Sequence, residues 1–302
     1  MAPIALPIGV AFQGVMMYGY AMVLNLNRLN PHFGAEITGL DLADGFSDET
    51  FGPISQAFID FGLVVIRDHE LSMPDQVDLG RRFGEVQIHV MDQYQRDDYP
   101  EIYFLTNLDD DGNPSGAHPD QGTLYWHTDG SWRDRTGQAT IMVADEVPAV
   151  GGETHFCCME AAYNALDEAT KRQISSLRSV HSLDFSRNRR HAHDPLTEAQ
   201  KSAIPPVAQP VTRIHPLTGR KSLFLGDHAE YIEGMDYADG RRFIDELNDR
   251  AVRPEFVYAH TYRTGDVVIW DNRRLLHKST PYDTATERRV MRRTTVLGDV
   301  PA

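Results

Sequence analysis

Cysteine is nearly absent from this chain of 302 residues, which holds only Cys157 and Cys158. Adjacent residues reach disulfide geometry only with strain, so the pair is poorly placed to form a bridge. A disulfide scaffold of the kind that stabilises small secreted domains is therefore excluded. We expect a reducing compartment, the cytoplasm.

Basic residues are also scarce. Lys and Arg number 29 against 44 Asp and Glu, a formal net charge of −15, and such a charge repels a phosphate backbone. Hydrophobic residues make up 41% and charged residues 24%, which is close to ordinary globular usage and disfavours both disorder and a membrane bundle. We therefore expect a soluble protein with no nucleic-acid partner and no membrane partner.

Charge is missing altogether from Met1 to Val23. This apolar stretch lacks the basic region of a signal peptide and is interrupted by Pro3 and Pro7, so it predicts neither export nor a membrane span. No Pro- or Ser-rich linker further along separates two domains. We predict a disordered or over-extended leader at 1–22 and a single domain at 23–302.

Helical patterns mark several segments. Ser47 can cap a helix whose apolar residues recur at helical spacing, and Gly62 ends it before the apolar run 63–66, which predicts a buried strand. We expect further helices from Ser72 to near Gly84, over 160–177 with a break at Asp167, and over 238–251.

Short extended runs rich in β-branched and aromatic residues predict the strands, at 139–144, 179–183, 222–225, 255–262, 267–270 and 290–297. The turn at 263–266 has the length of a hairpin loop. No alternation of strands with helices links the C-terminal strands, so we predict a mainly β fold with flanking helices, an antiparallel sandwich or jelly roll. The Asp-, Gly- and Pro-rich segment 109–122 is expected to be a long loop, and such loops are often lids.

A candidate metal site begins at Trp126-His127-Thr128-Asp129. In an extended segment, the side chains of His127 and Asp129 project from one face and can bind one ion together. His277 follows a predicted strand and turn much further along the chain. Two imidazoles and one carboxylate that leave metal positions open are typical of non-haem Fe(II) oxygenases, and zinc can bind the same set.

Four arginines lie near the C-terminus, in the predicted strand Arg288-Arg-Val-Met-Arg-Arg-Thr-Thr-Val296. Alternation places Arg289 and Arg293 on one face and Arg288 and Arg292 on the other. An inward-facing pair needs anions, because an unpaired buried guanidinium is costly. The alternative is a solvated basic strand at the edge of a sheet.

From about Asn25 to Asp299 the chain resembles the TauD/TfdA family of Fe(II)- and 2-oxoglutarate-dependent dioxygenases. The resemblance rests on six motifs in order: Gly34-Ala-Glu-Ile-Thr-Gly-Leu-Asp41, Phe83-Gly-Glu85, Trp126-His-Thr-Asp129, Gly151-Gly-Glu-Thr154, Trp270-Asp-Asn272 with His277, and Arg289-Val-Met-Arg-Arg-Thr-Thr295. The stretches 156–166, 199–207 and 219–225 look closer to the 2,4-dichlorophenoxyacetate dioxygenase branch than to the taurine branch.

The resemblance implies a double-stranded β-helix, a form of jelly roll, with His127, Asp129 and His277 as catalytic iron ligands. It further implies that Thr154 and Arg289 bind the co-substrate 2-oxoglutarate, which reacts with O2 to give succinate and CO2 while the substrate is hydroxylated. The interval from His277 to Arg289 is one residue longer than is usual in the family. Arg288 is therefore the alternative.

In the taurine branch, the positions of His89 and Arg293 help to hold the acidic group of the substrate. Here Asp92 stands where that branch has a tyrosine, and Thr123 replaces an asparagine, so taurine itself is a doubtful substrate. We expect a small anionic organic substrate, with an aryloxyalkanoate-like carboxylate favoured over a sulfonate. A zinc hydrolase with the same ligands, which would not need Arg289, is the alternative enzyme class, and we expect a homo-oligomer.

Overall fold

The computed structural model describes residues 12–13, 24–40, 42, 45–190 and 195–301. The predicted leader lies largely outside these residues; Phe12 and Gln13 form strand β1, which pairs with β2. None of the described helices is long and apolar enough to cross a membrane. The helices are α1 Asp48–Phe61, α2 Met73–Phe83, α3 Met159–Asn164, α4 Glu168–Ile174, α5 Leu183–Arg190, α6 Glu198–Ala203 and α7 Tyr237–Ala251, with 3-10 turns at Asp92–Tyr94, Gln121–Leu124 and Pro254–Phe256.

A large sheet has the strand order β1-β2-β3-β4-β14-β6-β16-β5. Its strands are β1 Phe12–Gln13, β2 Asn25–Arg28, β3 Ala35–Thr38, β4 Leu63–Ile66, β14 Val267–Asp271, β6 Gly137–Glu146, β16 Val290–Leu297 and β5 Tyr103–Thr106. Pairing is antiparallel except between β3 and β4, which run parallel because α1 crosses over between them.

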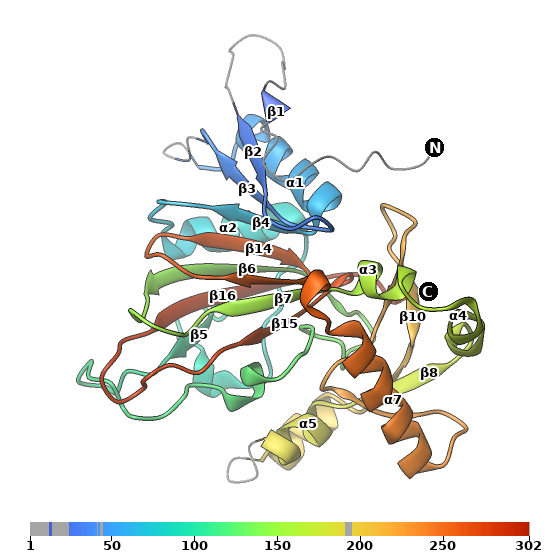
Figure 1. Cartoon of the computed structure of the whole chain (residues 1–302). Helices are drawn as coiled ribbons and strands as arrows, with labels where there is room; N and C mark the ends of the chain where they lie inside the picture. The colour runs from blue at the N-terminus through green and yellow to red at the C-terminus, as the bar shows by residue number, and fades with distance from the viewer. Residues whose placement is uncertain (1–11, 14–23, 41, 43–44, 191–194, 302) are drawn as a thin grey trace.

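A small sheet of β13 Val257–His260, β7 Thr154–Cys158 and β15 Leu275–Ser279 completes the jelly roll, so the predicted fold class is confirmed. Two more sheets extend the fold: β12 Ala229–Ile232, β8 Arg178–His181 and β9 Val207–Pro210, and the pair β10 Thr212–Ile214 and β11 Lys221–Leu223. Figure 1 shows α1 and α2 at one end of the molecule and α5 and α7 at the other.

The central strands of the large sheet are buried on both faces. Ile141 and Val143 of β6 pack with residues of α1 and α2, whereas Met142 and Ala144 belong to the core shared with the small sheet. Alternation along a central strand requires this, because successive side chains point to opposite faces. Helices α1 and α2 therefore cover the outer face of the large sheet, and its inner face packs against the small sheet.

Local signals placed the long helices correctly. The Ser47 hydroxyl accepts a hydrogen bond from Thr50 N, and Gly62 adopts the left-handed conformation at φ 73°, as the cap pattern predicts. Ser72 caps α2 in the same way, and Asp167 separates α3 from α4.

Three expectations from the sequence were wrong. The turn at 263–266 makes no hairpin, because β13 pairs with β7 while β14 pairs with β4 and β6. The strand predicted at 179–183 ends at His181, and helix α5, which we did not predict, begins at Leu183. Helix α6 was missed as well, since neither short helix carries a clear apolar stripe.

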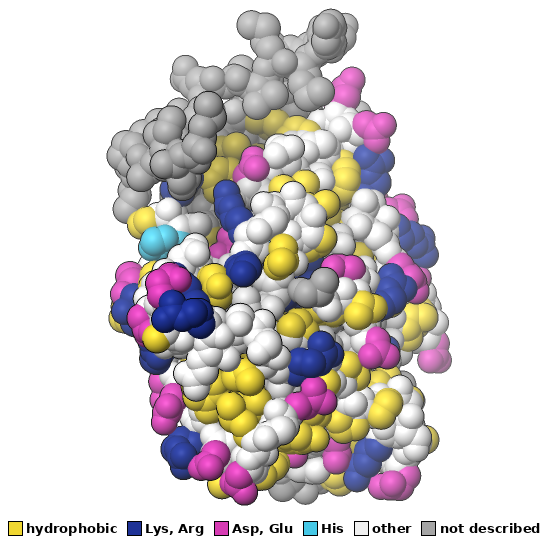
Figure 2. Space-filling view, turned by 90° about the vertical axis from the view of Figure 1, so that its right-hand side faces the viewer, with side chains coloured by type: hydrophobic (Ala, Val, Ile, Leu, Met, Phe, Trp, Pro, Cys, Tyr) yellow, Lys and Arg dark blue, Asp and Glu magenta, His cyan; other side chains and the backbone are white. Residues whose placement is uncertain are grey.

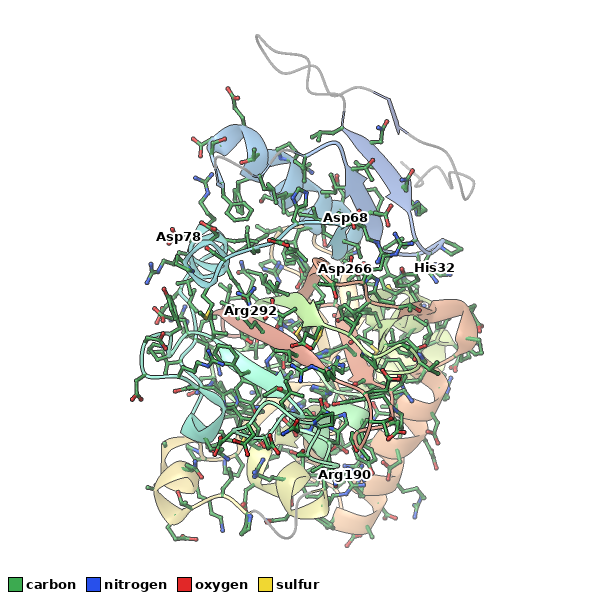
Figure 3. All side chains as sticks on the ribbon, turned by 90° about the vertical axis from the view of Figure 1, so that its left-hand side faces the viewer. His32, Asp68, Asp78, Arg190, Asp266 and Arg292 are labelled. Carbon is green, nitrogen blue, oxygen red and sulfur yellow. The ribbon has the colours of Figure 1, made fainter. Side chains whose placement is uncertain are left out.

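The basic strand is not at an edge. β16 lies between β6 and β5, so the solvated-edge alternative fails. Arg292 points toward α2, where its Nη1 donates to Gln76 Oε1 at 3.0 Å, and it also pairs with Asp145 (Figure 3). Arg289 and Arg293 lie on the other face, as alternation predicts, and both are buried.

Candidate active site

The His127 segment reaches the site without forming a regular strand. His127 N donates to His277 O at 3.0 Å and His277 N donates to His127 O at 2.8 Å, so the segment continues the small sheet beyond β15. The ligand atoms of His127, Asp129 and His277 all lie within 4.8 Å of one another, and the three residues are buried. The backbone pairing of His127 with His277 thus brings together two residues that lie far apart in the sequence.

The surroundings of the three side chains suit the binding of a divalent cation. His127 Nδ1 donates to Tyr125 O at 2.7 Å, which leaves the lone pair of Nε2 free. Burial, followed by the neighbouring His127, lowers the pKa of His277 well below its usual value, so its ring is neutral. Burial alone would raise the pKa of Asp129, but Arg293 and the two imidazoles together lower it below its ordinary range. A carboxylate and two imidazoles suit Fe(II).

Asn272 holds Asp129 in place through two routes. Its Oδ1 accepts from Asp129 N at 3.1 Å and from Trp270 Nε1 at 3.1 Å. Its Nδ2 donates to Thr140 Oγ1 at 2.8 Å, and the Thr140 hydroxyl donates to Asp129 Oδ2 at 2.7 Å. Outer partners of this kind orient metal ligands and tune their affinity. Thr140 was missed in the sequence, because nothing local distinguishes a strand threonine that faces a carboxylate.

A cavity of about 380 Å³ adjoins the cluster and is lined by His277, Thr154, Ser279 and Arg289, among others. Arg289 is 3% exposed, and its Nε donates to Gly152 O at 3.3 Å. Within the described residues, nothing accepts a hydrogen bond from its two terminal nitrogens. A buried guanidinium in this state calls for an anion.

Arg288 lies outside this cavity. Its side chain is 45% exposed, and two of its nitrogens pair with the carboxylate of Glu146. The additional residue between His277 and Arg289 therefore does not shift the inward position to Arg288.

Tyr262 lies beside Thr154 and was not identified from the sequence. Its hydroxyl donates to Thr154 Oγ1 at 3.0 Å, which leaves the hydroxyl hydrogen of Thr154 available to a ligand in the cavity. Burial raises the pKa of Tyr262 to about 12, so the phenol remains a donor at any physiological pH.

A larger cavity, of about 630 Å³, opens on the other side of the cluster. His127, Asp129, His89, Trp132 and Arg293 line it together with residues of α5. Arg293 Nη1 donates to Asp129 Oδ1 at 3.1 Å, whereas its Nε is buried without a partner among the described residues. Arg293 borders both cavities, and the three-residue cluster lies between them.

His89 is a neutral donor in this cavity. Its Nδ1 accepts from Met91 N at 3.1 Å, so the proton of the neutral ring is on Nε2. Burial, with Arg293 and Arg133 nearby, lowers the pKa of His89 to about 3. The side chain can therefore donate a hydrogen bond at neutral pH but adds no positive charge.

Helix α5 covers the larger cavity and contacts the segment that carries His127. Arg190 pairs with Asp227 through two nitrogens, and its guanidinium carbon lies 3.3 Å from the ring centroid of Tyr125, two residues before His127 (Figure 3). Ser186 Oγ lies 2.8 Å from His228 Nδ1. The sequence carried no signal for these residues, because their contacts join segments far apart in the chain.

Of the loop predicted as a lid, Asp120 and Gly122 line the cavity.

Fold and site together define an Fe(II)- and 2-oxoglutarate-dependent dioxygenase. The chain belongs to the family described as taurine catabolism dioxygenase TauD, TfdA family, whose model matches residues 25–295. Membership in this family indicates that the metal is iron and not zinc, and that 2-oxoglutarate and O2 are the co-substrates. When bound, the iron and 2-oxoglutarate supply an oxidant made from O2 that attacks C–H bonds.

The relatives agree with the predicted branch. The chain is 34% identical to the alpha-ketoglutarate-dependent 2,4-dichlorophenoxyacetate dioxygenase of Burkholderia sp. (strain RASC), over 92% of this chain and 95% of that protein. It is 33% identical to the (S)-phenoxypropionate/alpha-ketoglutarate-dioxygenase of Sphingobium herbicidovorans, over 90% and 94%. The crystal structure of AAD-2 in complex with Mn(II) and N-oxalylglycine matches with a TM-score of 0.80 at 32% identity, over 93% of this chain and 99% of that one.

Proposed function

We propose that this enzyme hydroxylates a small carboxylic acid of the aryloxyalkanoate type, with 2-oxoglutarate converted to succinate and CO2. The observation that carries the proposal is Arg293, a buried guanidinium in the larger cavity whose Nε has no partner among the described residues. The names of the relatives, which act on 2,4-dichlorophenoxyacetate and phenoxypropionate, support the same class.

In this proposal His127, Asp129 and His277 bind the iron. Arg289 binds the distal carboxylate of 2-oxoglutarate through its two terminal nitrogens, and Thr154 donates its hydroxyl hydrogen to the same group. Support comes from the smaller cavity, because Arg289, Thr154 and His277 are all among its lining residues. A bidentate guanidinium suits a planar carboxylate better than an ammonium would.

The primary substrate enters the larger cavity with its acid group toward Arg293 and His89. Arg293 supplies charge and His89 supplies a neutral hydrogen bond from Nε2. Trp132, 3% exposed, offers an apolar wall for an aromatic ring. Hydroxylation of the carbon between the ether oxygen and the acid gives an unstable product that breaks down.

Three matched compounds test the proposal: phenoxyacetate, phenoxymethanesulfonate and phenoxyacetamide, each assayed for substrate-dependent succinate release with Fe(II) and ascorbate. We expect turnover of the carboxylate and little of the amide. Preference for the sulfonate would move the substrate to the alternative class, and equal use of the amide would refute an anionic substrate.

We also propose a cytoplasmic homo-oligomer without nucleic-acid or membrane partners. The two cysteines support a reducing compartment, because both are buried and unpaired. On the face drawn in Figure 2, basic side chains are interspersed with acidic ones and form no continuous basic surface, which fits the net charge of −15. Light scattering of the purified protein would test the oligomeric state.

A further inference from the structure

Gln87 places a buried amide in the larger cavity. The residue is 6% exposed and lines this cavity together with His89, Arg293 and Thr295. The same four residues border a third cavity, of about 230 Å³, so they form the wall between this third cavity and the larger cavity. Gln87 lies two residues before His89 in the sequence.

The side chain of Gln87 has no hydrogen-bond partner among the described residues. Its Oε1 is buried and unpaired, whereas Nε2 is not among the buried atoms that lack a partner. A Cβ placed on Gly130, the residue after Asp129, would lie 3.6 Å from Oε1, so the amide reaches the metal-ligand segment. Packing alone does not explain an amide here, because an apolar side chain of similar size would fill the space without the cost of an unpaired polar group.

The backbone of Gln87 is held firmly. Its N–H donates to Thr295 O at 2.8 Å, and the preceding Val86 forms a bridge with Val296 of β16. Gln87 therefore lies on a segment that pairs with β16. Its backbone partner, Thr295, is two residues after Arg293 on that strand. The amide is presented from a rigid position, as a residue that discriminates between ligands requires.

We propose that Gln87 donates a hydrogen bond from Nε2 to the acid group of the primary substrate and thereby selects a carboxylate. The inference rests on the proposed function and deepens it. A carboxylate has two oxygens with about four acceptor positions. A bidentate guanidinium uses two of them, His89 Nε2 a third, and Gln87 Nε2 the fourth. His89 and Gln87 are both neutral, so Arg293 is the member of the set that supplies positive charge, and the four donors match the two oxygens of a carboxylate.

Two substitutions at this position test the proposal. Gln87→Leu removes the donor, and Gln87→Glu keeps the shape but turns a carboxylate toward the substrate. We expect Gln87→Leu to raise the KM for phenoxyacetate by roughly tenfold or more, and Gln87→Glu to raise it further, because a lost hydrogen bond to a charged group has about this effect. Neither should change the KM for 2-oxoglutarate or the Kd for Mn(II) by more than about twofold.

A matched control is Gln138→Leu. Gln138 Nε2 donates to Phe83 O, away from both cavities, so this variant loses a paired amide and should retain the KM for phenoxyacetate. Thermal unfolding of each variant shows whether it folds. Should Gln87→Leu fail to fold, the isosteric Gln87→Glu carries the test alone.

The outcomes separate this inference from the function on which it rests. If wild-type enzyme prefers phenoxyacetate over phenoxyacetamide, and both folded variants retain the KM for phenoxyacetate within twofold, Gln87 does not contact the acid group. If the wild type turns over phenoxyacetamide as efficiently as phenoxyacetate, the proposed function is wrong, and the role of Gln87 that rests on it is wrong too. A KM that rises equally for acid and amide would also overturn the role of Gln87 in binding the acid.

Discussion

Arg293 and Asp129 are joined by a hydrogen bond of 3.1 Å between Nη1 and Oδ1, so the guanidinium proposed to bind the substrate also contacts a proposed iron ligand. Both side chains are less than 10% exposed, at 7% and 8%, and the interaction is therefore weakly screened. A substrate anion that binds Arg293 competes with Asp129 for the same cation. With these proposed roles, substrate binding and metal binding are coupled through one side chain.

The first prediction concerns the metal. His127→Ala should abolish succinate formation and weaken Fe(II) binding by at least about tenfold to a hundredfold, since two remaining ligands hold an ion poorly. Anaerobic equilibrium dialysis measures the affinity. The exposed His32 provides the control, because His32→Ala should leave both quantities unchanged (Figure 3). Near-normal iron binding by His127→Ala would show that the ligand set is wrong.

The second prediction compares two neighbouring arginines. Arg289→Ala should weaken 2-oxoglutarate binding by about 2–4 kcal/mol, because it removes a bidentate pair with a desolvated carboxylate. Arg288→Ala should have little effect, since Arg288 pairs with Glu146 at the surface. Isothermal titration of 2-oxoglutarate into the Mn(II)-loaded protein distinguishes them, and the reverse ranking would contradict the assignment.

The third prediction concerns the primary substrate. Arg293→Gln should raise the KM for an acid substrate by roughly 30-fold or more, which corresponds to about 2 kcal/mol, and should change the KM for 2-oxoglutarate far less. Because Asp129 loses its partner, the Fe(II) affinity should change as well. Arg293→Lys keeps the charge and should recover part of the loss. Equal effects on both KM values would argue that Arg293 serves the shared site and not the substrate.

The fourth prediction tests the support of Asp129. Thr140→Val removes the hydroxyl that donates to Asp129 Oδ2 but keeps the shape of the side chain. We expect a loss in Fe(II) affinity of about tenfold and a cost in unfolding free energy of about 1 kcal/mol. Thr295→Val would be a poor control because Thr295 lines the substrate cavity; Thr212→Val on β10 is a suitable one. An unchanged metal affinity would mean that Asn272 positions Asp129 through the backbone alone.

The fifth prediction is a pH dependence of stability. Burial, followed by His228, lowers the pKa of His181 to about 3, and His181 is fully buried against Phe224. Between about pH 3 and the usual value of about 6.5, the unfolded chain binds a proton that the folded chain does not. The unfolding free energy should therefore fall as the pH drops through this range, by about 1.4 kcal/mol per pH unit for this residue.

Chemical denaturation at pH 5.0 and 6.5 measures that dependence. His181→Phe keeps an aromatic ring against Phe224 and should reduce the slope. A variant with the same slope as wild type would show that His181 is not the group responsible.

Much of the site was accessible from short-range patterns in the sequence. The spacing of His127 and Asp129 places their side chains on one side of the chain, and alternation places Arg293 of β16 and Arg289, which directly precedes β16, on the same inner face. The structure leaves both relations intact, although His127 lies in a single bridge and not in a regular strand. Such features survive because they depend only on backbone geometry between residues a few positions apart.

The prediction of a hairpin at 263–266 was wrong because strand pairing does not depend on local backbone geometry alone. A turn sequence specifies a change of direction, but not the partner with which the next strand pairs, and here β14 pairs with β4 and β6 in the other sheet. Cross-strand pairing is determined by which apolar faces can be buried together, a property of the whole chain.

By itself, the sequence determined the caps of α1 and α2, the mainly antiparallel β architecture, the family and the residue types of the metal cluster. Tertiary structure alone decided that Asn272 and Thr140 hold Asp129, that Tyr262 supports Thr154, and that Gln87 lies beside His89 and Arg293 with an Oε1 that has no partner in the described part of the chain. These contacts join side chains from different sheets and loops. Their distances and protonation states follow from burial in a shared low-dielectric space, which no local pattern encodes.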